Sequence, residues 1–307
     1  MKKTAGALLL SLSAFLFCAC GNAGETAPEA SEEKASIVVE NAEQVPSFET
    51  AEPREAEEPV AEEPEIISDT EPRQRDLDGD GIEESVFLRE EETEDGWTCW
   101  SLAVTDAAGR EYSHSSVIWS KARLRMEDLD CDGYTELFLW GDMGSDDPVL
   151  YCFRWADGAL KLLDFDTGEE TDDRLAPMDG CLEDVNGRSI TVGAWQYVLG
   201  TYGGRRTFEL GEDGIFRPAA GSIWEFSENT RWLTAKTELS GALEDGTSAV
   251  PQGTRVRLLG WDGVSHVFFE TEDGRRGTFV LNRDPLSGWR LGGLSEWDCF
   301  EALPYAG

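Results

Sequence analysis

Two short segments of the chain carry carboxylates at a spacing that suits a metal ion. The first reads DLDGDGIEE over residues 76–84, and the second reads DLDCDGYTE over residues 128–136. Both have acidic residues at positions 1, 3, 5 and 9 and glycine at position 6. Alternate side chains of a tight loop point into one concavity, and calcium prefers about six to eight oxygen ligands, main-chain carbonyls included. The spacing therefore predicts two calcium sites.

The residues after each loop decide between two kinds of calcium motif. An EF-hand needs glutamate at position 12 and a helix on each side, whereas position 12 holds Phe87 or Leu139 and a strand-like run follows. An Asp-rich loop that leads into a strand resembles the FG-GAP or VCBS repeats of integrin-type propellers and bacterial surface proteins. Those repeats more often have aspartate at position 9. The ligands implied for the two sites are Asp76, Asp78, Asp80, the carbonyl of Ile82 and Glu84, and then Asp128, Asp130, Asp132, the carbonyl of Tyr134 and Glu136.

A third segment looks like a degraded copy of the loops. Asp184 and Asn186 keep the first and third positions, but Arg188 stands at the fifth. We expect a third repeat in which a built-in cation has replaced the metal. Repeats of this period have the size of a propeller blade, yet three copies are too few to close a ring of about four to eight blades. The expectation is a compact set of blade-like β-meanders, incomplete as a propeller, over residues 73–226.

The elements that must position these loops read as strands. Apolar alternation, the pattern of half-buried strands, recurs along the chain, and Asp-Gly pairs typical of hairpin turns separate several of the runs. No stretch shows sustained helical periodicity, so an all-β fold is predicted. The expected strand segments are residues 85–89, 97–105, 136–140, 149–155, 160–165, 189–199, 205–210, 255–259, 264–270 and 277–281.

The last part of the chain, residues 227–307, reads as a separate small unit. The run PQGTRVRL at residues 251–258, a following strand and DGRRG at residues 273–277 resemble a bacterial Src-homology-type (SH3-like) barrel. Thr278 stands where that family has tryptophan, and the family's usual opening is missing near Leu233. The resemblance implies a cell-wall peptide or glycan as ligand. Four tryptophans form either a sugar-stacking surface or, more commonly in a small β-domain, part of the core: Trp232, Trp261, Trp289 and Trp297.

The first 72 residues predict export and a tether. Lys2 and Lys3 precede an apolar run at residues 5–17 that is too short to span a bilayer and is typical of a signal peptide. LFCACG at residues 16–21 resembles a lipoprotein lipobox, which implies removal of residues 1–19, lipidation of Cys20 and an extracytoplasmic protein anchored to the bacterial cell membrane. Residues 21–72 hold sixteen acidic residues against Lys34 and Arg54, so residues 20–72 should form a disordered acidic tether.

Composition narrows the functional classes. A net charge of −36 disfavours nucleic acid and anionic lipid and favours cations as partners. The two histidines are isolated, and no nucleophile elbow or Cys-x-x-Cys pair occurs. Five cysteines follow Cys20, an odd number that leaves their pairing open. We therefore predict a non-enzymatic, calcium-binding surface lipoprotein that acts as a binding or scaffold module toward wall glycan, wall peptide or a surface protein. The alternative is an exported cell-wall hydrolase that the C-terminal unit targets.

Overall fold

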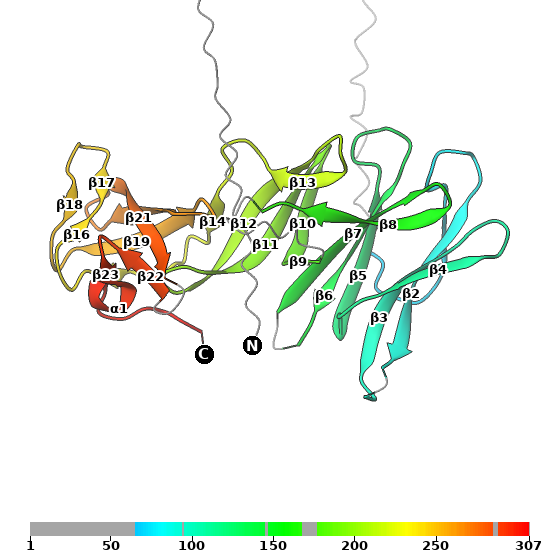
Figure 1. The fold of residues 1–307 in the computed structure, drawn as a ribbon, viewed down its shortest axis with the longest axis horizontal. Helices are drawn as coiled ribbons and strands as arrows, with labels where there is room; N and C mark the ends of the chain where they lie inside the picture. Colours follow the sequence, from blue (N-terminus) through cyan, green and yellow to red (C-terminus); the bar gives the residue numbers. More distant parts are fainter. Residues whose placement is uncertain (1–64, 94, 145–146, 168–176, 285–287, 307) are drawn as a thin grey trace, which may run out of the picture. The chain divides into compact units, whose positions relative to one another are not determined.

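The computed structural model describes residues 65–93, 95–144, 147–167, 177–284 and 288–306 (Figure 1). Within these ranges the regular elements are β-strands and one helix of four residues, so the predicted all-β class is confirmed. Every predicted strand segment overlaps an observed strand, although several boundaries differ.

Residues 73–115 form a four-stranded antiparallel meander, here called the first blade, in which the sheet order follows the sequence order. Its strands are β1 (Arg73–Arg75), β2 (Glu84–Glu92), β3 (Thr98–Thr105) and β4 (Glu111–Ser115). In β2 the buried residues Val86 and Leu88 alternate with partly exposed ones, as expected for a strand with one face on a core. The first acidic loop, residues 76–84, makes the connection from β1 to β2.

Residues 120–165 form the second blade, another antiparallel meander. Its strands are β5 (Ser120–Glu127), β6 (Glu136–Asp142), β7 (Pro148–Ala156) and β8 (Ala159–Phe165), and the short β9 (Met178–Asp179) pairs with the start of β7. Strand β6 is buried along almost its whole length, which is typical of a central strand covered on both faces. The second acidic loop, residues 128–136, connects β5 to β6 and so occupies the place that the first loop has in the first blade.

The third blade begins after β9. Its strands are β10 (Cys181–Asn186), β11 (Ser189–Tyr197), β12 (Thr201–Leu210) and β13 (Ile215–Pro218), followed by β14 (Trp224–Phe226). The degraded third loop lies at the β10–β11 connection, where it is reduced to a tight turn because Asn186 pairs directly with Ser189. Strand β13 runs parallel to β8, so the second and third blades share backbone pairing.

The C-terminal strands surround an antiparallel meander of β19, β20 and β21. The elements are β15 (Leu233–Thr234), β16 (Leu239–Ser240), β17 (Ala242–Leu243), β18 (Ala249–Val250), β19 (Arg255–Trp261), β20 (His266–Thr271), β21 (Arg276–Asp284), β22 (Gly288–Leu291), β23 (Leu294–Ser295) and α1 (Glu296–Cys299). Among the described residues the strand pairings form no closed barrel, because β15 to β18 are only two residues long and pair over short stretches. The predicted barrel is therefore an open sheet, and its SH3-like relationship stays a prediction.

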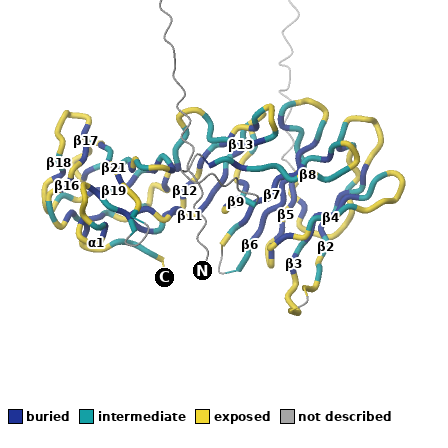
Figure 2. The backbone as a smooth tube through the Cα atoms, viewed as in Figure 1, coloured by how far each residue is buried: buried dark blue, intermediate teal, exposed yellow. Residues whose placement is uncertain are grey.

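Two apolar clusters hold the strands together. Figure 2 shows the buried stretches along the strands and exposed ones at many of the loops. One joins the first and second blades and includes Leu77 of the first acidic loop. The other runs from the second and third blades into the C-terminal strands and includes Phe208 and Phe279. Strand β14 pairs with both β12 and β19. The predicted division between residues 226 and 227 thus falls within shared packing, and the division into two domains stays a prediction.

The folded part begins earlier than residue 73. Ile67 is only 1% exposed and exchanges both of its backbone hydrogen bonds with Leu124, each at 2.9 Å. The predicted tether therefore ends before Ile67, since this apolar residue gains a place in the core despite its acidic surroundings. The predicted signal peptide, Cys20 and residues 20–64 lie outside the described residues. None of the helices in the described part has the length and apolarity needed to cross a bilayer.

The five cysteines after Cys20 are all free thiols. Cys99, Cys152 and Cys299 are buried, and burial raises the pKa of the Cys299 thiol to about 11. These thiols pack as small apolar side chains. Cys131, inside the second acidic loop, is exposed.

Candidate metal centre

The two acidic loops share one hydrogen-bonding plan. At position 1, Asp76 accepts hydrogen bonds from the backbone N–H groups of Gly79 and Gly81, at 2.8 and 2.9 Å. Asp128 does the same in the second loop, where Asp132 and Gly133 donate at 3.2 and 3.1 Å. The first carboxylate therefore closes each loop upon itself.

Position 5 also behaves alike in both loops. Asp80 accepts the N–H of Ile82 at 2.7 Å, and Asp132 accepts the N–H of Tyr134 at 2.9 Å. Ile82 and Tyr134 thus stand at the predicted seventh position with their N–H groups engaged. Their role as carbonyl ligands stays a prediction.

The glutamates at position 9 are buried beneath the loops. Glu84 is 5% exposed and Glu136 is not exposed at all. Each carboxylate accepts a 3.0 Å hydrogen bond from the residue at position 2, Leu77 or Leu129. Burial raises the pKa of Glu84, and the neighbouring charges of Asp78 and Asp80 raise it further. The longer glutamate side chain reaches under the loop and ties its first residues to the start of the strand.

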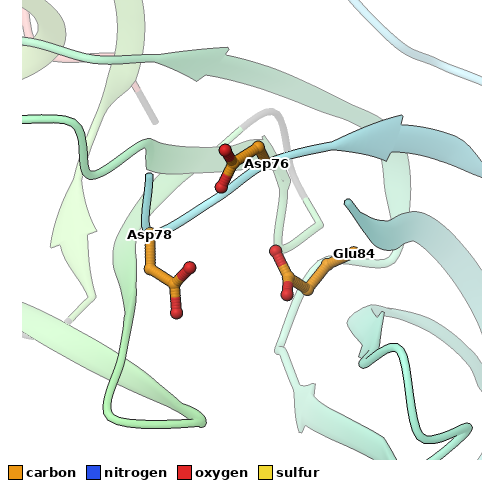
Figure 3. Close-up of side chains that lie close together, drawn as sticks. All are labelled: Asp76, Asp78 and Glu84. Atoms are coloured by element: carbon orange, nitrogen blue, oxygen red, sulfur yellow. The ribbon is translucent and has the colours of Figure 1, made fainter. Parts of the chain in front are cut away.

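In the first loop three carboxylates converge. Oxygens of Asp76, Asp78 and Glu84 all lie within 4.8 Å of one another, and Figure 3 shows the three groups turned toward a common space. Oδ1 of Asp78 is buried and has no hydrogen-bond partner. In the described part of the chain no lysine or arginine forms an ion pair with any acidic residue of this loop. The available ligands are hard oxygens, and one of them, Oδ1 of Asp78, has no partner. No described basic side chain would compete with an added cation, so this loop suits calcium.

In the second loop the converging carboxylates are Asp128, Asp130 and Asp132, and arginine is present. Arg154, on β7, donates to Oε1 of Glu136 through Nε at 2.6 Å and to Oδ2 of Asp132 through Nη1 at 3.1 Å. Its Nη2 lies 3.7 Å from Oδ1 of Asp130, a buried oxygen without a hydrogen bond. The carboxylate of Glu136 is therefore already paired with the guanidinium of Arg154.

A second arginine approaches the same loop. Arg188, in the β10–β11 turn, donates to the carbonyl of Leu210 at 3.2 and 3.0 Å, and its Nη2 lies 3.7 Å from Oδ2 of Asp130. The sequence predicted Arg188 as a cation within its own degraded loop. The structure instead places it beside the second loop, since the third connection is too tight to enclose a charge.

The two acidic loops also contact each other. The N–H of Thr135 donates to the carbonyl of Leu77 at 2.8 Å. A Cβ atom on Gly79 would lie 3.0 Å from the carbonyl oxygen of Gly133, so the two backbones meet at glycines. Leu77 and Leu129 are both buried. A cation bound in one loop would therefore affect the backbone conformation and the electrostatic potential of the other loop.

Sequence reasoning found the carboxylates but missed Arg154. Its place follows from the pairing of β6 with β7, which sets Glu136 directly opposite Arg154. These residues are 18 positions apart, and only the register of the hairpin brings them together.

Comparison of the chain with protein-family models, with curated proteins and with solved structures gave no match.

Proposed function

We propose that this protein is a calcium-stabilised surface module in which the first acidic loop is the principal calcium site. The observation that carries the proposal is the convergence of Asp76, Asp78 and Glu84 around a buried oxygen of Asp78 that has no partner. Calcium would take these carboxylates as ligands and relieve their mutual repulsion, which grows as surrounding solvent is excluded. The second loop would bind calcium more weakly, because the ion has to compete with Arg154 for Asp130, Asp132 and Glu136.

The role of the ion in this proposal is structural. The first loop joins β1 to β2, and its Leu77 lies in the core shared by the first and second blades. An ion that fixes the loop would therefore stabilise the contact between blades. Extracellular calcium modules have dissociation constants of about 0.1–1 mM. At a ligand concentration about a hundred times above this constant, one site adds about 2.7 kcal/mol to the free energy of unfolding.

The wider function in the proposal rests on the sequence. The lipobox-like segment at Cys20 would anchor the protein to the outer face of the cell membrane, and the acidic residues that follow would hold the folded part away from it. The net charge of −36 favours cationic partners over nucleic acid. The folded part would then serve as a binding or scaffold module that recognises a partner and catalyses no reaction, with calcium as its cofactor.

Thermal unfolding of the purified protein in excess chelator, in calcium and in magnesium tests the proposal. We expect calcium at about a hundred times the dissociation constant to raise the melting temperature by about 5–10 °C. Magnesium should give a smaller shift, because it demands a tighter octahedral arrangement and gives up its water reluctantly. Equal melting temperatures in chelator and in calcium would rule out the calcium site and leave the loops as acidic turns.

A further inference from the structure

A cavity of about 470 Å³ lies away from the acidic loops and is walled by aromatic side chains from strands far apart in the sequence. Strand β11 contributes Trp195 and Tyr197, β14 contributes Trp224, and β19 and β22 contribute one tryptophan each. We call it the tryptophan pocket and define it by Trp195, Tyr197, Trp224, Trp261, Trp289 and Arg283. Of the four tryptophans that the sequence analysis grouped, only Trp261 and Trp289 meet here, with ring centroids 5.7 Å apart.

Two indole N–H groups in the wall of this pocket have no partner. Trp224 is 3% exposed and Trp261 is 7% exposed, and the Nε1 atom of each is buried without a hydrogen bond to any described residue. Trp289 differs, since its Nε1 donates to the carbonyl of Tyr197 at 2.7 Å. A buried donor without an acceptor is destabilising, because it has given up its hydrogen bonds to water and gained none in return. Two of the residues that line this cavity therefore carry a donor that an oxygen acceptor would satisfy.

The polar residues of the lining limit what the ligand is. Asp147, Asp179 and Arg283 are exposed residues that line the cavity, so both signs of charge are present. A cation would face Arg283 and an anion would face the two aspartates. A neutral molecule whose groups both donate and accept hydrogen bonds satisfies all three. Trp195 and Tyr197, which are 48% and 56% exposed, add aromatic surface.

We propose that the tryptophan pocket binds a neutral carbohydrate. The apolar face of a pyranose ring packs on indole rings, and its hydroxyl or acetamido oxygens accept the N–H groups of Trp224 and Trp261. Hydroxyl groups also donate to Asp147 or Asp179 and accept from Arg283. The volume falls in the range of small-ligand sites, about 300–1,000 Å³. This inference does not depend on calcium, because the acidic loops contribute no residue to the pocket.

Nitrogen-15 NMR of the indole groups of the full-length protein tests the proposal. The chain has eleven tryptophans, and Trp224→Phe and Trp261→Phe each remove one indole signal and so assign it. The probes are tetrasaccharides of β-1,4-linked N-acetylglucosamine, of cellulose and of amylose, with trialanine as a peptide probe. We expect at least one tetrasaccharide to shift the Trp224 and Trp261 signals saturably, and trialanine to leave them unchanged.

Affinity measurements on variants complete the test. Loss of one indole donor, in Trp224→Phe or Trp261→Phe, should weaken the bound tetrasaccharide about three- to tenfold. Trp297→Phe is the matched control, because Trp297 is 55% exposed and lies outside the pocket, and its affinity should equal that of the wild type. Arg283→Gln, an exposed change that leaves the core intact, should weaken binding about threefold. The proposal is overturned if no tetrasaccharide shifts the two signals, if trialanine shifts them instead, or if the control loses as much affinity as the buried variants.

Discussion

The two acidic loops share the spacing of four carboxylates, a first aspartate that accepts the N–H of position 6, and a buried glutamate at position 9, yet their negative charges have different neighbours. In the first loop the carboxylates of Asp76, Asp78 and Glu84 face one another with no described basic side chain in ion-pair reach. In the second, Arg154 spans Asp132 and Glu136. In the described part of the chain, no basic side chain pairs with the carboxylates of the first loop, whereas Arg154 pairs with those of the second.

The difference arises on the neighbouring strand, outside both loops. In the second blade, the residue opposite the buried glutamate is Arg154. In the first blade, Glu84 is paired with Arg75 of β1, which forms no ion pair with it among the described contacts. On the other side Ser85 pairs with Thr105, the last residue of β3, and the next residue along the chain is Asp106. Asp106 is itself engaged by Arg110 at 2.8 Å. A repeated metal motif therefore predicts metal dependence only when the cross-strand neighbour is known, and the following changes test this conclusion.

The largest effect should come from Arg154→Met. This change keeps an apolar stem but leaves the fully buried Glu136 without its guanidinium. Removal of one partner from a buried ion pair costs about 3–5 kcal/mol. We expect a loss of that order in the free energy of unfolding, measured by urea denaturation in chelator. Calcium should restore part of it, because the second loop then resembles the first.

The matched control for this change is Arg89→Met. Arg89 pairs with Glu111 in the first blade, and both side chains are partly exposed, at 35% and 43%. Exposed ion pairs contribute at most about 1 kcal/mol. If Arg154→Met costs no more than the control, Arg154 is a surface contact and the two loops differ less than their geometry indicates.

The next effect separates the loops by their aspartates at position 3. Asp78→Asn should remove most of the calcium-dependent gain of about 2.7 kcal/mol. In chelator the same variant should be at least as stable as the wild type, because one of the converging charges is gone. Asp130→Asn should keep most of the calcium response. Unfolding curves of both variants with and without calcium measure this, and equal losses in the two variants would show that both loops bind the ion alike.

Much of this architecture followed from local sequence, and the part that did not depends on distant contacts. The alternation around Val86 and Leu88 and the carboxylates before it indicated both a strand and its loop. Strand β5 was not among the predicted segments, although charged and apolar residues alternate without a break through residues 121–127. The pairing of Glu136 with Arg154 and the meeting of Trp224 with Trp261 at one cavity depend on strand register and on packing between strands. The residue pattern within a single strand does not predict these contacts.

The smallest effect concerns backbone conformation at position 4 of the loops. Gly79 and Cys131 both have left-handed conformations, with φ of 72° and 55°. A residue with a side chain pays about 1–2 kcal/mol for this conformation. Gly79→Cys makes the first loop match the second, and its Cβ would also approach the carbonyl oxygen of Gly133 to 3.0 Å. We expect this variant to lose about 1–2 kcal/mol in the free energy of unfolding.

The reverse change, Cys131→Gly, should have a smaller effect of the opposite sign. Glycine relieves the left-handed strain at Cys131, but it also adds conformational entropy to the unfolded chain, worth about 0.4–1 kcal/mol, so the net gain lies between about 0 and 1.6 kcal/mol. Cys131 is exposed, so the loss of its thiol opens no cavity. Urea denaturation in chelator measures both variants without interference from calcium. A loss in both directions would mean that each loop has its own backbone, fitted to its own residue. Opposite signs would mean that the loops share one backbone and differ chiefly in the cation that neutralises them.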